Sequence, residues 1–121
     1  MLRIAICDDD PLMLSSLAAL CKKILPEAEV TEYKSGVELL SGNGGFEIIL
    51  MDVRMPVMNG YEATREIRRL AREDARQIPI VAMTADAFSS DIKMALNAGM
   101  NEHLSKPVSI ERLQEVLGQW L

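Results

Sequence analysis

The sequence is poor in the residues that build most metal, redox and disulfide sites. It contains one histidine and two cysteines, and the cysteines match no zinc-binding spacing. Both Cys7 and Cys21 lie in apolar patterns and are interpreted as core residues. Aromatic residues make up only 4% of the chain, and no segment reads GxxxxGKS or GxxxxGKT. A zinc site, a disulfide framework and a conventional P-loop kinase are therefore not expected.

Basic residues are fewer than acidic residues, 13 against 18, and long apolar runs are lacking. The formal net charge is −5, which disfavours direct nucleic-acid binding and makes a cation the better small partner. No apolar run approaches the ~20 residues that cross a bilayer. The first residues lead into a strand pattern without a signal-peptide core. We expect a cytoplasmic domain that does not insert into a membrane.

The chain is long enough for one globular domain. It has 121 residues, 49% of them hydrophobic, and we expect a single domain over residues 1–121. Short apolar runs alternate with helix-period segments, which predicts βαβ units around a parallel sheet. A helix is expected after each of the predicted strands, which are Leu2–Cys7, Glu29–Tyr33, Phe46–Met51, Ile78–Met83 and Glu102–Ser105.

The polarity of these strands predicts their order. The first, third and fourth are almost wholly apolar, as strands covered on both faces are. The second (EVTEY) and the fifth (EHLS) carry the polar residues expected at sheet edges. With right-handed crossovers, this distribution predicts an α/β fold, a three-layer doubly wound (βα)5 domain. Its flavodoxin-like parallel sheet is expected in the order 2-1-3-4-5.

Capping signals predict where the helices begin and end. Asp10 is the expected N-cap of the first helix, with Pro11 at the first helical position. Capping-box spacing predicts the next two helix starts, at Ser35 with Glu38 and at Asn59 with Glu62. The fourth helix is expected to end near Gly99. The fifth is expected to begin at about Ser109, with an inner face formed by Ile110, Leu113, Leu117 and Trp120 or Leu121.

Polar residues follow four of the predicted strands at their carboxyl ends. They are Asp8-Asp9-Asp10, Asp52, Thr84 and Lys106-Pro107. In a doubly wound sheet, these ends meet at the crevice where the winding changes direction, which is where ligands bind. Any single Asp after a strand is at least as often a helix cap. The convergence of four positions on one crevice therefore predicts a functional site.

The residue types at this crevice predict phosphoryl chemistry. Carboxylates packed together repel one another unless a cation or protons neutralise them. Mg²⁺ prefers oxygen ligands and is often held by one or two carboxylates and phosphate oxygens. A metal-bound carboxylate can attack phosphorus and form an aspartyl-phosphate. Mg²⁺ and Lys106 would offset charge on the transferring oxygens, and Thr84 would donate a hydrogen bond to one of them.

Four segments, IAICDDDPLM, ILMDVRMPVMNGYE, IPIVAMTADAF and AGMNEHLSKPV, resemble the receiver domains of bacterial two-component response regulators. The resemblance covers essentially the whole chain. It implies that Asp8 and Asp9 hold Mg²⁺ and that Asp52 is the phosphoacceptor. Further implied roles are a metal-binding backbone carbonyl at Arg54, a switch hydroxyl at Thr84, a phosphate-binding Lys106 and a cis peptide before Pro107. Asp10 is interpreted as a helix cap.

The resemblance also implies partners and a switch. The phosphoryl donor would be a histidine kinase or a histidine phosphotransfer protein, and the chain would promote its own phosphorylation and dephosphorylation without being a conventional enzyme. The output surface would comprise the fourth predicted helix, the fifth strand and the fifth helix, acting on an effector that the sequence does not identify. The segments around Thr84 and Lys106 are most like the receivers of hybrid sensor histidine kinases.

The resemblance raises questions at three positions. His103 stands where the family often has Tyr or Phe as a switch residue, and its alternatives are a half-exposed edge histidine or a pH sensor. The resemblance implies that the side chains of Arg54 and Asp86 tune the lifetime of the phosphoryl group; the alternative for Arg54 is a side chain that extends into solvent.

Two other functions stay open at this point. The first is a pseudo-receiver that only binds proteins; loss of Asp52 or Lys106 would favour it, and the presence of both argues against it. A flavin-binding electron carrier would need phosphate-cradling loops where this chain has three aspartates.

Overall fold

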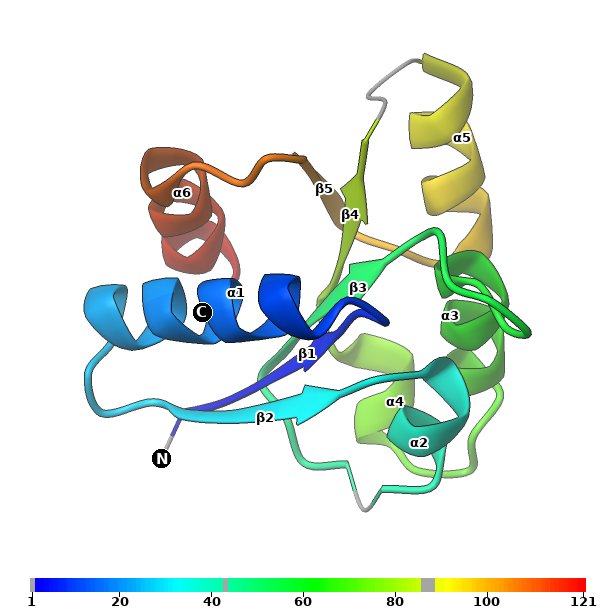
Figure 1. The fold of residues 1–121 in the computed structure, drawn as a ribbon. Coiled ribbons are helices and arrows are strands. Elements are labelled where there is room, and N and C mark those ends of the chain that lie inside the picture. The colour runs from blue at the N-terminus through cyan, green and yellow to red at the C-terminus, as the bar shows by residue number, and fades with distance from the viewer. Residues whose placement is uncertain (1, 43, 86–88) are drawn as a thin grey trace.

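The chain folds into a parallel five-stranded sheet in the order β2-β1-β3-β4-β5, as the sequence predicted (Figure 1). The computed structural model describes residues 2–42, 44–85 and 89–121. The strands are β1 (Arg3–Cys7), β2 (Glu29–Tyr33), β3 (Ile48–Asp52), β4 (Ile80–Thr84) and β5 (Glu102–Ser105).

Three strands differ slightly from the predicted ranges. β1 begins at Arg3 rather than Leu2, while β3 and β4 each begin two residues later than predicted and include the polar residue at their carboxyl end. Pro79 has no N–H to donate to a sheet ladder, so β4 begins after it. The carbonyl of Pro79 still accepts a hydrogen bond from Ile49 N. The predicted site residues Asp52 and Thr84 are therefore parts of the strands themselves.

Six helices lie within the described residues. They are α1 (Pro11–Ile24), α2 (Gly36–Leu40), α3 (Gly60–Arg68), α4 (Asp74–Gln77), α5 (Ser89–Ala98) and α6 (Ile110–Trp120). The short helix α4 was not predicted, so the fourth and fifth predicted helices are α5 and α6. α4 has no side-chain cap and buries only Ala75. It consequently offers neither a cap nor a periodic apolar pattern to sequence analysis.

The predicted caps are largely confirmed. Asp10 accepts a hydrogen bond from Leu12 N and Pro11 is the first residue of α1. The capping box of α3 is complete, with Asn59 and Glu62 each accepting from the other's backbone N–H. Gly99 follows α5 with a φ of 105°.

One detail of the helix prediction was wrong. Ser35 accepts from Glu38 N, but the Glu38 carboxylate accepts from Lys34 N rather than from Ser35 N, so the box of α2 is only half formed. The predicted inner face of α6 is confirmed: Leu113 and Leu117 are buried, and Trp120 packs against the same core, whereas its alternative Leu121 is 41% exposed. Leu121 lies beyond the last helical residue, where the chain no longer follows the inner face.

The sheet is covered on both faces, which gives three layers. α1 and α6 cover one face, and α2, α3, α4 and α5 cover the other (Figure 1). Successive residues of β1 contribute to opposite cores: Ile4 and Ile6 pack toward α1 and α6, whereas Ala5 and Cys7 pack toward α2 and α3. This double coverage explains the continuous apolar runs of β1, β3 and β4. It also confirms the core interpretation of both cysteines, which are fully buried.

None of the helices within the described ranges has both the length and the apolar content that a bilayer crossing requires.

Candidate functional site

Three carboxylates meet at the carboxyl edge of the sheet. Asp8 directly follows β1 and is 1% exposed, and Asp52 ends the neighbouring strand β3 and is 4% exposed. Asp9 is exposed beside them. One oxygen from each of Asp8, Asp9 and Asp52 lies within 4.8 Å of the other two. Oxygen ligands of one Mg²⁺ ion lie up to about 4.2 Å apart, so this all-oxygen group fits the ion with a small closure or an intervening water.

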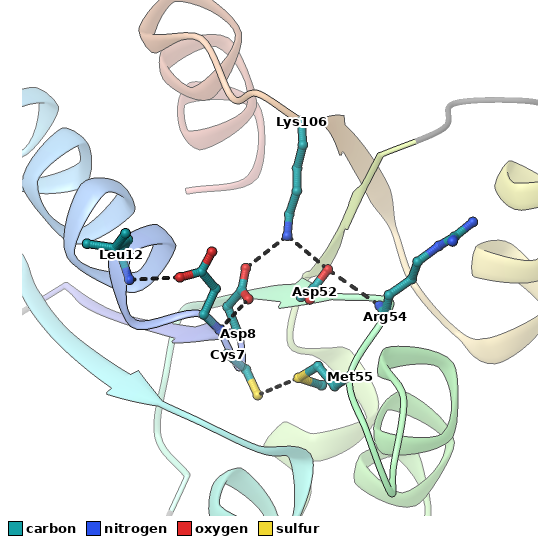
Figure 2. Close-up of polar contacts among 8 residues, drawn as sticks. Cys7, Asp8, Leu12, Asp52, Arg54, Met55 and Lys106 are labelled. Carbon is teal, nitrogen blue, oxygen red and sulfur yellow. Dashed lines mark hydrogen bonds and ion pairs between the residues drawn. The ribbon is translucent and has the colours of Figure 1, made fainter.

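Lys106 bridges the two buried carboxylates. Its Nζ lies 3.0 Å from Asp8 Oδ2 and 3.1 Å from Asp52 Oδ1 (Figure 2). Burial raises the pKa of Asp52; the hydrogen bond from Lys106 opposes this effect and the charge of Asp8 adds to it. Burial alone would lower the pKa of Lys106, but its hydrogen bonds to Asp8 and Asp52 outweigh burial and raise it. One ammonium thus pairs with two buried carboxylates, and Asp9 adds a third carboxylate to the group, which leaves net negative charge to attract a cation.

Backbone hydrogen bonds extend the sheet past the strand ends and fix these residues. Asp8 N donates to the carbonyl of Tyr33, and Lys106 N donates to the carbonyl of Thr84 over 2.8 Å. The peptide bond between Lys106 and Pro107 is cis, as expected. The positions of Asp8 and Lys106 are therefore fixed by the register of the strands that precede them, β1 and β5.

The loop between β3 and α3 wraps closely around the end of β3. Arg54 N lies 3.4 Å from Asp52 Oδ1. Val57 has a φ of 67°, and Met58 N donates to the carbonyl of Pro56, which closes a three-residue turn. Gly60 begins α3 directly against the strand, because a Cβ there would lie 2.8 Å from the Cα of Val53. This close approach requires glycine.

Residues 4–118 match the model of the response regulator receiver domain. The chain belongs to this receiver domain family. Membership confirms the predicted place in two-component signal transduction and leaves the flavin-binding carrier without support.

The receiver domain aligns with parts of much longer sensor kinases. It is 34% identical over 121 residues to the sensor protein GacS of Pseudomonas syringae pv. syringae, covering 98% of this chain and 13% of that protein. It is 34% identical over 110 residues to the signal transduction histidine-protein kinase BarA of Shigella flexneri, covering 91% of this chain and 12% of that protein. The chain spans about one eighth of the length of these curated relatives.

Solved structures show the same architecture. The receiver domain of sensor histidine kinase PA1611 from Pseudomonas aeruginosa PAO1, which has a magnesium ion coordinated in its active site cleft, is 36% identical with a TM-score of 0.87. That match covers 98% of this chain and 96% of the other. The chemotaxis protein CheY4 of Vibrio cholerae has a TM-score of 0.90 at 24% identity, covering 100% of this chain and 99% of the other. The latter likeness shows the fold alone.

The remaining predicted site residues lie around this receiver site. Thr84 ends β4 with 5% exposure, and its partner in the sheet register is Ser105, the residue before Lys106. Asp10 caps α1 and also donates its backbone N–H to Asp8 Oδ1, so it supports the cluster without joining it. The side chain of Arg54 points away from the carboxylates (Figure 2). Asp86 lies outside the described residues.

His103 occupies the edge strand β5 with a half-buried side chain. Its Nδ1 lies 3.6 Å from Glu102 Oε1, and its carbonyl accepts a hydrogen bond from Arg112. With α5 residues it also lines a groove of about 220 Å³, formed by Ile92, Ala95, Leu96, Met100, Asn101, Glu102 and His103. His103 thus borders both the ion pair of Glu102 with Arg112 and the open space of the groove.

One contact at this site was not anticipated from the sequence. The Cys7 thiol lies behind the carboxylates, with Sγ 3.7 Å from Met55 Sδ (Figure 2). Burial, with a smaller contribution from Asp8 and Asp52, raises the pKa of Cys7 to about 12. The thiol is therefore protonated at neutral pH and donates toward the thioether.

Proposed function

We propose that this receiver domain accepts a phosphoryl group on Asp52 in a Mg²⁺-dependent reaction with a phosphohistidine donor. The observation that carries the proposal is the joint placement of three carboxylates within 4.8 Å of one another and of Lys106 Nζ 3.1 Å from Asp52. The donor would be a histidine kinase or a histidine phosphotransfer protein, since the chain resembles segments of hybrid sensor kinases.

The proposed residues divide the chemistry between them. Asp8, Asp9 and Asp52, with the backbone carbonyl of Arg54, would hold Mg²⁺, which supplies positive charge to the transferring oxygens. A carboxylate oxygen of Asp52 forms the bond to phosphorus while the bond from phosphorus to the donor's imidazole nitrogen breaks. The other ring nitrogen of the donor carries a proton, so the imidazole leaves with that electron pair as neutral histidine. Positioning and charge account for most of the rate of such a transfer.

Lys106 changes partners during this reaction. It now pairs with Asp8 and Asp52, and it would move to an oxygen of the incoming phosphoryl group once Asp52 is modified. Thr84, at the end of the neighbouring strand, would donate its hydroxyl to another of these oxygens. These new contacts exist only in the phosphorylated state, so they favour one conformer over the other.

The proposed output surface, which would bind a partner, is formed by α5, β5 and α6. Thr84 connects the site to this region through β4, and His103 lines the groove between α5 and β5. An inward shift of Thr84 would change the space available to His103 and hence the surface offered to a partner. The presence of this chain within a longer sensor kinase is part of the same proposal, because its matched relatives are much longer.

Phosphorylation with a small donor tests the proposal directly. The protein is incubated with acetyl phosphate, with and without Mg²⁺, and its intact mass is measured beside an Asp52→Asn control. A Mg²⁺-dependent gain of one phosphoryl group, absent from the control, is expected. If neither protein gains mass and beryllofluoride, a stable phosphoryl mimic, also fails to bind, the chain is an interaction module instead.

A further inference from the structure

The contact between Cys7 and Met55 connects the two segments that carry proposed metal ligands, the end of β1 and the loop after β3. Cys7 immediately precedes Asp8, and Met55 immediately follows Arg54, so the neighbours of two proposed metal ligands touch each other. Cys7 is fully buried and Met55 is 7% exposed, and both belong to the core beneath α2 and α3. Figure 2 shows the two sulfur atoms on the opposite side of the carboxylates from Lys106.

The loop that carries Arg54 depends on such anchors. Before Arg54, Val53 is held by a hydrogen bond from its N–H to the carbonyl of Met83 in β4. After Arg54, the chain turns through Val57, which is 98% exposed and holds no core position. Met55 is therefore the buried side chain that fixes the loop on the far side of Arg54.

We propose that Cys7 is a positioning residue for the metal site. Through Met55 it sets where the Arg54 carbonyl lies relative to Asp8. This inference rests on the proposed function, because it concerns the ligands of the same Mg²⁺ ion. It assigns a role to a residue that sequence patterns place only in the core.

The volume of the thiol explains how the effect arises. Methionine has a flexible side chain that adapts to the space around it. Without the Cys7 sulfur, Met55 would fill the vacancy by moving, and the attached Arg54 carbonyl would move with it. Valine at position 7 fills the space of the sulfur with two methyl groups, is only slightly larger than cysteine and suits a strand, so Cys7→Val is the matched conservative variant.

Cysteine 21 provides an internal control. It is also fully buried, but it lies on α1 in the core of the opposite face of the sheet. Cys21→Ala creates a cavity from the same residue type and should lower stability without reaching the metal site. The two alanine variants therefore separate loss of packing from loss of positioning.

The test measures the Mg²⁺ dissociation constant by calorimetry and amide hydrogen exchange of the β3–α3 loop in metal-free protein. We expect Cys7→Ala to weaken Mg²⁺ binding roughly 3- to 10-fold, below the 10- to 100-fold typical of direct outer-shell partners. Arg54 and Met55 amides should exchange faster in this variant. Cys21→Ala should leave both quantities unchanged, and Cys7→Val should restore most of the affinity. Met55→Ala should be non-additive with Cys7→Ala, since both remove one contact.

Equal behaviour of Cys7→Ala and Cys21→Ala in both measurements would overturn the inference and leave Cys7 a packing residue. Failure of the proposed function has a different signature, since the parent protein itself would then bind no Mg²⁺. In that case the metal-free exchange rates of the loop still decide whether Cys7 positions Arg54.

Discussion

Replacing Lys106 with methionine removes a positive charge that lies between Asp8 and Asp52. Among the described residues, no other side chain is seen to pair with both carboxylates. Its Nζ contacts both carboxylates at 3.0 and 3.1 Å, and the side chain is 20% exposed. Methionine keeps most of the length of the side chain while removing the ammonium. The substitution therefore leaves two buried carboxylates facing each other without their cation.

Two opposite effects follow from this geometry. Removing one partner of a buried ion pair typically costs about 3–5 kcal/mol, and partial exposure of this site reduces the expected loss of unfolding free energy to about 2–3 kcal/mol. A unit charge and a divalent ion about 4 Å apart repel by about 2 kcal/mol even at the dielectric constant of water. Because the flexible lysine can move aside, we expect its removal to strengthen Mg²⁺ binding by about 1.4 kcal/mol, which is roughly tenfold.

Urea unfolding and Mg²⁺ titration measure both effects. Lys22→Met, at an exposed position in α1, changes the net charge equally and serves as the control. Unfolding is followed in chelator and in excess Mg²⁺, where binding to the folded state should recover much of the lost stability. The reasoning is refuted if Lys106→Met binds Mg²⁺ no more tightly than Lys22→Met.

Three further predictions concern stability and reactivity. Gly60→Ala should lower the unfolding free energy by about 1–3 kcal/mol, because the added Cβ would meet the end of β3. Gly118→Ala, with open space around the added Cβ, should raise the unfolding free energy by about 0.5–1 kcal/mol. Urea unfolding of both variants measures the two changes. Burial raises the pKa of Cys21 to about 11, so at about pH 8 its thiol should resist alkylation until the protein unfolds, as mass spectrometry can show. Arg68→Met should cost about 2–3 kcal/mol in thermal or urea unfolding, since the guanidinium donates to the backbone carbonyls of Ala75 and Gly99 and to Asn101 Oδ1.

The arrangement of the sheet was predictable because it follows from strand polarity. β2 and β5 have partly exposed residues at the two edges, whereas every residue of β3 and β4 is buried. The same pattern placed Asp8, Asp52 and Lys106 together, since parallel strands present their carboxyl ends at one edge. The roles of the individual site residues remain proposals, and the placement of Asp86 lies outside the described residues.

Features that depend on local backbone geometry were not predictable. The capping box at Ser35 and Glu38 has the correct spacing, yet the glutamate carboxylate accepts from Lys34 N, one residue before the expected donor. Helix α4 is a single turn between two longer elements and has no side-chain cap. The position of Lys106 was predicted, but its bridging of two carboxylates depends on distances that sequence spacing does not contain.

The Cys7–Met55 contact was predictable only in part. Strand periodicity fixes the face on which Cys7 lies, because Ala5 and Cys7 must point away from Ile4 and Ile6, and a slip of one residue would exchange the two sets. Periodicity does not reveal that the loop after β3 folds back to bring Met55 onto this face, 48 residues along the chain. Since Asp8 follows Cys7 directly, the packing that orients the thiol also determines on which side of the strand the carboxylate emerges. The core beneath α3 and the acidic site above it are therefore set by the same register of β1 against β3.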